Sequence, residues 1–292
     1  MIRLTTHCQS VRKMTKITNS FSLLISLLIV LGLSNLSYAA SIEIQGSLQQ
    51  GSLLIGKVPQ GHQVIYQQKK LKLTSNGQFL LGLGRNAPNQ IEITVIKPNS
   101  QSVIEVFPIA TREYNIQRIE GVPKKTVTPS EADLIRIRSD VVLVKNARRE
   151  VTDRVDFLLG FKEPDIGPIT GVYGSQRFYN GVPKNPHYGI DYAAPTGTLV
   201  KAPSGGVVTL AHNDLFYSGG TLIIDHGHGL SSTFLHLSEI DVELGQIVDP
   251  DQVIGKVGST GRSTGPHLDW RMNWRDQRID PKLVLESLPR AN

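Results

Sequence analysis

Short apolar runs separated by glycine and proline turns dominate this chain of 292 residues from Ile166 onward. Gly205-Gly206 precedes Val207-Val208, and Gly219-Gly220 precedes Leu222-Ile223-Ile224. Short runs rich in valine and isoleucine and bounded by turn residues are typical of β-strands, and no segment with helical periodicity appears until the chain is nearly finished. The pattern predicts an antiparallel β domain with long loops over residues 166–292.

The segment from Ser41 to about Ile119 has a similar pattern of short apolar runs. Turn residues such as Asn76-Gly77 separate runs that are rich in Val, Ile and Leu. These runs are Gln63–Tyr66, Leu71–Leu73, Phe79–Leu83, Ile91–Ile96 and Val103–Phe107. The segment contains no cluster of catalytic residue types. We therefore predict a small N-terminal all-β domain over residues 41–120.

The connector between these segments, residues 121–165, predicts a surface helix. Thr128 fits an N-cap, Pro129 the first helical position, and Glu131 the end of a capping box. Apolar residues then recur at the spacings of one helix face. They are Leu134, Ile137, Val141, Val144, Val151, Val155 and Leu158. We expect an arm packed on the C-terminal domain, with a partner-binding or membrane-binding helix as the alternative.

Residues 1–40 have the order of a secretory signal peptide, with cleavage after Ala39 or Ala40. Basic residues up to Lys16 precede an apolar stretch from Phe21 to Leu33. An uncleaved membrane anchor is the alternative, although such a helix needs ~20 apolar residues. We expect export to the periplasm or cell envelope, with membrane attachment only if the leader is uncleaved. The single cysteine, Cys8, lies in this leader, so the mature protein would contain neither a disulfide nor a catalytic thiol.

The net charge of +6 does not indicate a nucleic-acid partner. Four of the basic residues lie in the leader, and removing them from the total of 31 leaves 27 against 25 acidic residues. No run of lysine or arginine longer than two remains to form a phosphate-binding stripe. We therefore expect no nucleic-acid binding, and the sequence leaves the oligomeric state unknown.

Potential metal ligands are concentrated in the C-terminal domain. His187 and Asp191 are four residues apart in an extended segment, so their side chains share one side of the chain. His267 and Asp269 repeat this arrangement at a spacing of two, and His236 stands alone in an apolar run. Singly, a histidine such as His236 is more often a hydrogen-bonded structural residue. Together, in a domain without cysteine, these residues predict a zinc site with nitrogen and oxygen ligands.

Three motifs resemble the signatures of the lysostaphin-like zinc metallopeptidases, which are peptidoglycan endopeptidases with a LytM-type catalytic domain. The motifs are His187-Tyr188-Gly189-Ile190-Asp191, Leu235-His236-Leu237-Ser238 and the segment from Gly258 to Asp269. The resemblance covers roughly Gly171 to Leu285 and includes the glycine-rich framework between the motifs. It implies a mainly β protein whose C-terminal domain is an antiparallel metallopeptidase domain of this type.

The resemblance also implies a role for each residue. His187, Asp191 and Asp269 correspond to the ligands of Zn²⁺, and His236 and His267 to the two catalytic histidines. The family usually has histidine at the position of Asp269. Aspartate is an accepted zinc ligand, so the set remains chemically sound. Two anionic ligands would, however, leave the metal less electrophilic.

The activity implied is zinc-dependent hydrolysis of the peptide stems or cross-links of bacterial peptidoglycan. The sequence around Gln176-Arg177 and from Trp270 to Trp274 resembles members from cells with an outer membrane, which favours a D,D-endopeptidase of cell-wall remodelling. Arg177 and Tyr179 are expected to donate to the oxyanion. The alternative is a catalytically inactive member that binds and activates a cell-wall amidase. An N-terminal domain that covers the groove and inhibits the site is compatible with either.

Overall fold

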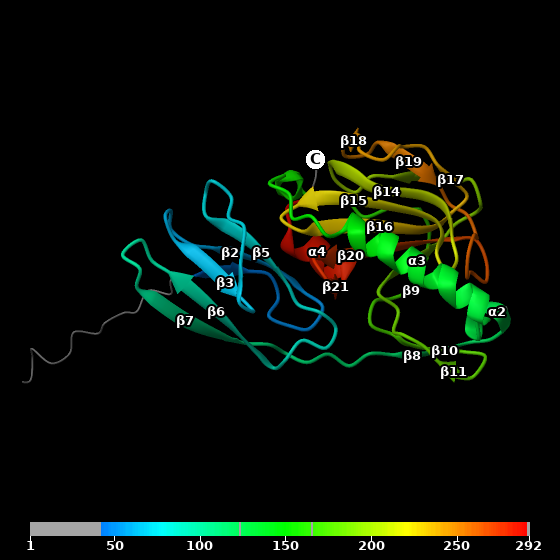
Figure 1. The fold of residues 1–292 in the computed structure, drawn as a ribbon, viewed down its shortest axis with the longest axis horizontal. Helices are drawn as coiled ribbons and strands as arrows, with labels where there is room; N and C mark the ends of the chain where they lie inside the picture. Colours follow the sequence, from blue (N-terminus) through cyan, green and yellow to red (C-terminus); the bar gives the residue numbers. More distant parts are fainter. Residues whose placement is uncertain (1–41, 123, 165, 291–292) are drawn as a thin grey trace, which may run out of the picture. The chain divides into compact units, whose positions relative to one another are not determined.

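The computed structural model describes residues 42–290 except residues 123 and 165 (Figure 1). The predicted signal peptide, residues 1–40, lies outside the described residues. Within the described part, no helix is long and apolar enough to cross a membrane. The protein is mainly β, as the sequence predicts.

Strands account for most of the regular structure. The N-terminal part and the connector contain β1 (Glu43–Gln45), β2 (Leu53–Lys57), β3 (Gln63–Tyr66), β4 (Lys69–Lys70), β5 (Gln78–Gly82), β6 (Gln90–Ile96), β7 (Ser102–Pro108), β8 (Ile116–Ile119), α2 (Lys124–Val127), α3 (Glu131–Ala147) and the 3₁₀ helix η1 (Asp156–Leu159). The C-terminal part contains β9 (Ile169–Gly171), β10 (Gln176–Tyr179), β11 (Val182–Pro183), β12 (Gly189–Ala193), β13 (Leu199–Lys201), β14 (Gly206–Leu215), β15 (Gly219–Gly227), β16 (Leu230–Leu237), β17 (Glu239–Ile240), β18 (Ile247–Val248), β19 (Val253–Lys256), β20 (His267–Trp274), β21 (Gln277–Ile279) and α4 (Pro281–Ser287).

The N-terminal β module consists of two small antiparallel sheets. Their strand orders are β1-β2-β5 and β4-β3-β6-β7. Four of the five predicted runs coincide with strands, but the prediction of a strand at Leu71–Leu73 is wrong. The chain leaves the ladder after β4, because the buried side chain of Leu71 turns into the core while its N–H donates to the carbonyl of Val64.

The C-terminal part is built on one large antiparallel sheet of eight strands. Its order is β18-β14-β15-β16-β20-β12-β9, with β21 paired to β20. Phe234 of β16 lies opposite Trp270 of β20, and both are fully buried on the core face of the sheet. The opposite face therefore carries the polar residues that alternate with them.

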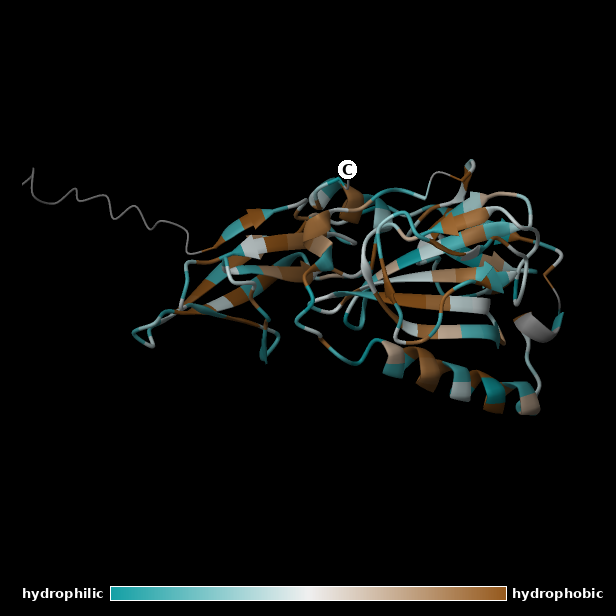
Figure 2. Cartoon of the chain, turned by 90° about the horizontal axis from the view of Figure 1, so that it is seen from above, coloured by the Kyte–Doolittle hydropathy of each residue, from teal (hydrophilic) through white to brown (hydrophobic). Residues whose placement is uncertain are grey.

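A single cluster of buried side chains runs from the N-terminal β module into the large sheet. A Cβ atom added at Gly82 of β5 would lie 2.5 Å from Cβ of Trp274, so β5 packs directly against the end of β20. Figure 2 shows the matching hydrophobic bands, in brown, across the strands of both parts. The division into domains at residues 120 and 166 stays a prediction.

The last strand of the segment predicted as the N-terminal domain, β8, pairs with the C-terminal part, which the sequence did not predict. β8 pairs in parallel with β10, with Ile116 opposite Gln176 and Ile119 opposite Tyr179. β10 in turn pairs with β11. The segment between the two β regions is therefore held in place by backbone hydrogen bonds along β10.

Helix α3 begins later than the sequence predicted. Its N-cap is Ser130, whose hydroxyl accepts the N–H of Asp133 at 3.2 Å, while the Asp133 carboxylate accepts the N–H of Ser130 at 3.3 Å. The cap predicted at Thr128 is wrong, because the N–H of Thr128 donates to the carbonyl of Lys124 and so ends α2. The helix start therefore lies two residues further on.

The apolar stripe of α3 is also shorter than predicted. The helix ends at Ala147, so Val151, Val155 and Leu158 lie outside it. Val144 and Ala147 pack against a small buried cluster on the large sheet, formed by Leu210, Leu215 and Ile223. In Figure 1, α3 crosses the sheet in front of β15 and β16. The helix is thus an arm packed on the sheet.

Candidate metal centre and paired histidines

Two neighbouring strands bring the predicted carboxylates together. In the pairing of β12 with β20, Asp191 lies directly opposite Asp269. His187 precedes β12, and backbone hydrogen bonds with residues 174–175 fix its position. The three side chains therefore converge although they come from two segments that are about 80 positions apart in the sequence.

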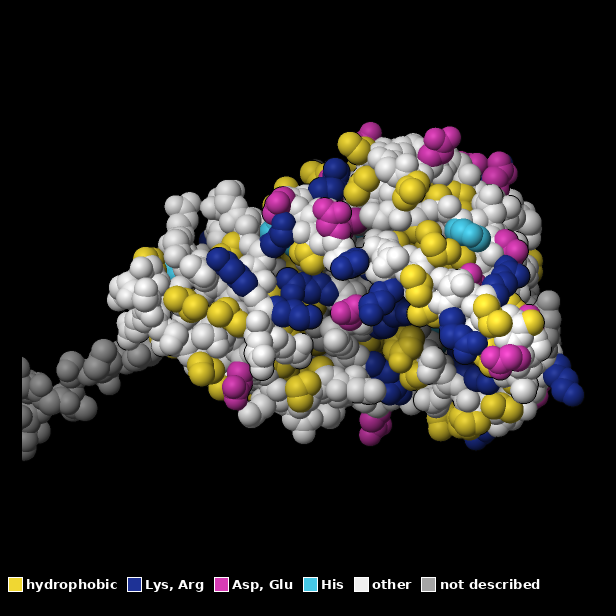
Figure 3. Space-filling view, viewed as in Figure 1, with side chains coloured by type: hydrophobic (Ala, Val, Ile, Leu, Met, Phe, Trp, Pro, Cys, Tyr) yellow, Lys and Arg dark blue, Asp and Glu magenta, His cyan; other side chains and the backbone are white. Residues whose placement is uncertain are grey.

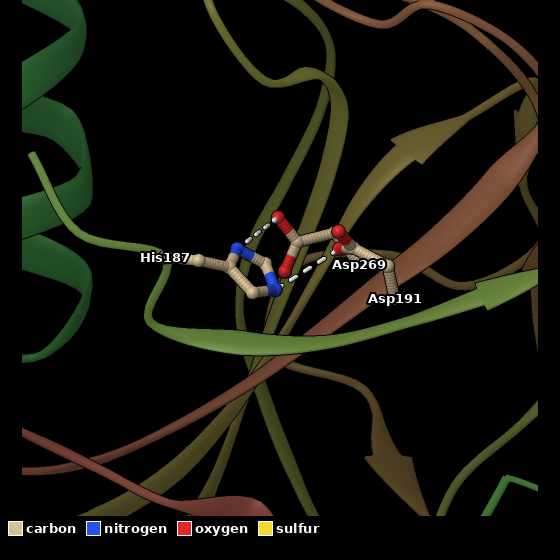
Figure 4. Close-up of side chains that lie close together, drawn as sticks. All are labelled: His187, Asp191 and Asp269. Carbon is tan, nitrogen blue, oxygen red and sulfur yellow. Dashed lines mark ion pairs between the residues drawn. The ribbon is translucent and has the colours of Figure 1, made fainter. Parts of the chain in front are cut away.

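The three side chains form a compact, buried group (Figure 4). Nε2 of His187 lies 3.2 Å from Oδ1 of Asp191, and its Nδ1 lies 4.0 Å from Oδ2 of Asp269. One ligand atom from each residue lies within 4.8 Å of the others. Each ring nitrogen faces one carboxylate, so a single ion would be held by one nitrogen of His187 together with carboxylate oxygens.

The donor atoms of this group fit a zinc ion. Both ring nitrogens of His187 and Oδ1 of Asp191 are buried and have no hydrogen-bond partner among the described residues. Burying such atoms unpaired is unfavourable, so a cation bound to one ring nitrogen of His187 and to Oδ1 of Asp191 would satisfy both of these atoms. Nitrogen and oxygen ligands at ~2.0 to 2.2 Å from a tetrahedral zinc ion lie roughly 3.3 Å apart, close to the separation of His187 and Asp191.

Each carboxylate of the group has an arginine partner. The sequence did not predict either pairing. Nη2 of Arg177 donates to Oδ2 of Asp191 at 2.5 Å. Arg271 binds Asp269 with two hydrogen bonds, Nε to Oδ1 at 2.9 Å and Nη2 to Oδ2 at 2.5 Å. The sequence contained a signal for Arg271, because residues two positions apart in a strand, such as Asp269 and Arg271, lie on the same face. The two arginines offset the negative charge of the two aspartates.

These partners also keep the carboxylates ionised. Burial and the charge of Asp269 raise the pKa of Asp191, but His187 and Arg177 outweigh them and the net pKa is lowered. Burial likewise raises the pKa of Asp269, and the charges of Arg271 and His187 lower it to a net value below the ordinary range. Both aspartates are therefore anionic at neutral pH, as carboxylate ligands of a metal ion must be.

His236 reaches the same site through an irregularity of β16. Simple alternation would place its side chain with Phe234 on the core face. The pairing of β15 with β16 shifts register between Gly220 and Leu222, and His236 has a left-handed backbone with φ of 63°. This bulge turns the imidazole to the site face, where its ring centroid lies 4.8 Å from that of His267.

Backbone carbonyls fix the orientation of both imidazoles. Nδ1 of His236 lies 2.7 Å from the carbonyl oxygen of Thr260, and Nδ1 of His267 lies 2.8 Å from that of Gly265. A carbonyl only accepts, so each Nδ1 is assigned the proton and each Nε2 is left as an acceptor. Burial lowers the pKa of His236 to about 4, so this imidazole is neutral at neutral pH. Nε2 of His267 lies 4.0 Å from Oδ1 of Asp191.

A groove of about 400 Å³ lies in front of these groups, and the connector forms part of its wall. Residues 117–119 and Val122 line it together with Asp191, His236 and His267. Gln117 of β8 accepts a hydrogen bond from Nε of Arg177 at 3.1 Å. Arg177 also binds Asp191 and the hydroxyl of Tyr179, and both Arg177 and Tyr179 line the groove, so their expected oxyanion role stays a prediction.

The sequence matches a known peptidase family. Residues 185–281 match the model of Peptidase family M23. The DD-carboxypeptidase/endopeptidase Mpg of Neisseria meningitidis is 43% identical over 103 residues, which is 35% of this chain and 24% of the relative. The peptidoglycan DD-endopeptidase ShyA of Vibrio cholerae is 42% identical over 95 residues, which is 32% of this chain and 22% of the relative. The matched part spans about a quarter of the length of these relatives.

One solved structure resembles most of the chain. The crystal structure described as a peptidase M23 from Pseudomonas aeruginosa is similar over 83% of this chain and 97% of that chain, with a TM-score of 0.66 and 29% sequence identity. This coverage is wider than the segment that matches the family model. The likeness therefore includes residues that precede the matched segment.

Proposed function

The chain carries a peptidase family M23 domain, and from this premise we propose that it is a zinc-dependent endopeptidase that hydrolyses peptide cross-links of bacterial peptidoglycan. The observation that carries the proposal is the convergence of His187, Asp191 and Asp269 beside the paired His236 and His267. Relatives named as DD-endopeptidases favour the D,D-specific version, in which a bond to D-alanine is cut.

In this proposal His187, Asp191 and Asp269 hold the metal. Zinc supplies a Lewis acid that polarises the carbonyl of the scissile bond and stabilises the negative charge that develops on its oxygen. Arg177 and Arg271 are positioning residues: their hydrogen bonds to the two carboxylates fix the orientation of these ligands. Residues that orient ligands in this way commonly change metal affinity by ~10 to 100-fold when they are removed.

The paired histidines are placed to accept and donate protons. Nε2 of His236 is a neutral acceptor, so it orients the attacking water and accepts its proton. His267 lines the groove and is less buried, so its Nε2 can take up a proton from solvent and pass it to the leaving amine, while the proton accepted by His236 returns to solvent. Both rings keep their orientation during this exchange, because Nδ1 of each stays bound to a backbone carbonyl.

The substrate determines where the protein acts. Peptidoglycan lies outside the cytoplasmic membrane, so the proposed activity requires export. The basic, apolar and small-residue order of residues 1–40 supports a secretory leader that directs the protein to the periplasm. The proposed partners are accordingly peptide stems and cross-links of the cell wall.

One observation favours the second candidate, an inactive relative that activates a cell-wall amidase. Both oxygens of Asp269 already accept hydrogen bonds from Arg271, so this carboxylate is satisfied without a metal. Against it stand the unpaired ring nitrogens of His187 and the unpaired oxygen of Asp191. Nε2 of His187 and Oδ1 of Asp191 lie 3.2 Å apart, and a cation bound between them would give both atoms a partner.

Metal content and hydrolysis together test the proposal. We expect one zinc per chain and cleavage of purified cross-linked peptides. Asp191→Asn should lower both, whereas His236→Ala should keep the zinc and lower kcat by ~100-fold or more, because only a proton-transfer group is lost. His212→Ala, a histidine on β14 outside the groove, is the control. A protein that binds no zinc and cleaves no wall fragment, yet stimulates an amidase, would establish the second candidate.

A further inference from the structure

A second cavity, of about 380 Å³, lies between α3 and the site face of the large sheet. Four arginines line it: Arg148 at the end of α3, Arg271 on β20, and Arg275 and Arg278 in the hairpin that follows. Apolar residues such as Val141 and Leu235 form the remainder of its wall. We call this space the arginine cavity. It borders the candidate metal centre, because Arg271 lines the cavity and also binds Asp269.

Three of these arginines have no anionic partner among the described residues. Arg271 is paired with Asp269, but Arg148, Arg275 and Arg278 form neither an ion pair nor a side-chain hydrogen bond there. Nε of Arg148 and Nε of Arg275 are buried without an acceptor. A buried, unpaired cation costs stability, so this arrangement is unfavourable unless an anion completes it.

Aromatic rings support two of the guanidinium groups without using their N–H donors. The guanidinium carbon of Arg275 lies 4.9 Å from the ring centroid of Trp274, and that of Arg278 lies 5.5 Å from the centroid of Tyr188. Contact with a ring face stabilises the cation but leaves the in-plane donors free. These donors are therefore available to a ligand.

The acidic residues of the cavity do not balance its positive charge. Asp140 and Asp276 line it, as does Lys145. Oδ2 of Asp140 accepts the N–H of Phe216 at 2.7 Å, and Asp276 is exposed to solvent. Figure 3 shows lysine and arginine side chains, in dark blue, gathered on this face near the C-terminal end of α3. Burial and the neighbouring guanidinium groups lower the pKa of Arg148 to about 9, and burial lowers that of Arg278 to about 10.

We infer that the arginine cavity is a binding site for an oxyanion, held by Arg148, Arg275 and Arg278 with Arg271 at its inner edge. The planar fork of donors on a guanidinium group matches the two oxygens of a carboxylate or phosphate, and such charge-assisted hydrogen bonds are the stronger kind. The ligand replaces the missing counter-charge and satisfies the buried Nε atoms.

Two sources provide this chemistry. One is a carboxylate of the peptide substrate, because Arg271 places the cavity one side chain away from Asp269. This source rests on the proposed function. The other is a free inorganic anion, which requires no catalytic activity. In both cases the anion lies beside Arg271, whose Nε and Nη2 donate to Asp269.

Inorganic phosphate is the probe for the site itself. Thermal unfolding and calorimetry of the full chain are followed while phosphate replaces chloride at constant ionic strength, which removes general screening. We expect Tm to rise with phosphate and a saturable binding heat to appear. Arg148→Gln and Arg278→Gln should each weaken binding by ~10-fold or more, the loss expected for one charged hydrogen-bonding group.

The variants keep this test decisive. Arg148→Gln removes an unpaired buried charge, so we expect it to fold and to unfold at a higher temperature than the parent without phosphate. Arg138→Gln, an exposed α3 arginine paired with Glu131, is the matched control and should bind phosphate as the parent does. Equal Tm in phosphate and chloride, or an equal loss of binding in Arg138→Gln, would overturn the inference.

Substrate peptides distinguish the two sources. Kinetics of the zinc-loaded protein are compared for cross-linked peptides with free and with amidated carboxylates. A KM that rises on amidation in the parent, but not in Arg148→Gln, identifies the substrate carboxylate as the ligand. Phosphate binding with no effect of amidation identifies a free anion. If no peptide is cleaved, the proposed function fails, and the phosphate titration still decides the site.

Discussion

At Asp269 this chain has a carboxylate where the lysostaphin-like resemblance leads one to expect histidine. Arg271 lies two residues further along β20 and binds both oxygens of that carboxylate. An aspartate and an arginine together carry no net charge, which is the charge of a neutral imidazole. The pair therefore offsets the loss of electrophilicity that two anionic ligands would otherwise cause at the metal.

Arg271→Met tests this compensation. Without metal, the variant leaves Asp269 buried and unpaired, so we expect a loss of about 3–5 kcal/mol in the free energy of unfolding. Zinc would supply the missing positive charge, so the gain in Tm on adding zinc should be larger in the variant than in the parent. Thermal unfolding with a chelator and with zinc measures both quantities. Lys256→Gln, in an exposed ion pair with Glu239, is the control. The same loss with and without zinc would contradict compensation.

At the scale of elements, the strands β8, β9 and β10 fix the position of Asp191 and of its partner Arg177. β9 passes so close to β12 that only glycine fits opposite Asp191. β10 supplies Arg177, and β8, which precedes the connector, pairs with β10 and binds Arg177 through Gln117. The orientation of Asp191 therefore depends on three strands besides its own partner β20.

Gly171→Ala is the matching change at β9. An added Cβ would lie 2.2 Å from Oδ2 of Asp191 and 3.1 Å from Nη2 of Arg177, so it must displace the carboxylate or its partner. We expect zinc affinity, measured by competition with a chelator, to fall by ~10 to 100-fold, as for other changes behind metal ligands. Gly265→Ala, where an added Cβ meets no atom within 4 Å, is the control. Unchanged affinity in Gly171→Ala would show that Asp191 does not need this close approach.

At the scale of the whole molecule, one buried core joins the N-terminal module to the large sheet. A buried histidine, His226, contacts a residue of this core. His226 on β15 binds the carbonyl of Gly205 through Nδ1 at 2.6 Å and lies 2.9 Å from the hydroxyl of Ser232. Its ring also contacts Phe161 edge-on. It is a structural residue of the sheet.

This histidine makes stability depend on pH. Burial lowers the pKa of His226 from 6.5 to about 4. Between these two values the unfolded chain therefore binds the proton more readily than the folded chain. The free energy of unfolding should fall as the pH drops from about 6.5 to about 4, and the stability that depends on neutral His226 is fully present above this window. Urea unfolding across the window should show a shallower decline for His226→Gln than for the parent. The partly exposed His212→Gln is the control, and a parallel decline in all three proteins would exclude His226 as the cause.

Local patterns in the sequence were sufficient for much of this protein. Turn residues between β-branched runs predicted the antiparallel sheet, and the spacings of His187 with Asp191 and of His267 with Asp269 placed both pairs on single faces. These properties depend on neighbours along the chain. The same reasoning misplaced the cap of α3, because Thr128 and Ser130 are both suitable caps and only the end of α2 decides between them.

Contacts between distant segments were decided by the tertiary structure alone. Alternation would bury His236 in the core, and a bulge set by the register of β15 against β16 turns it to the site. Arg177 meets Asp191 because β8 holds β10 in place, and four arginines from the end of α3 and from the β20–β21 hairpin line one cavity. Strand register and long-range packing determine such contacts, and neither is encoded in the spacing of residues along a single segment.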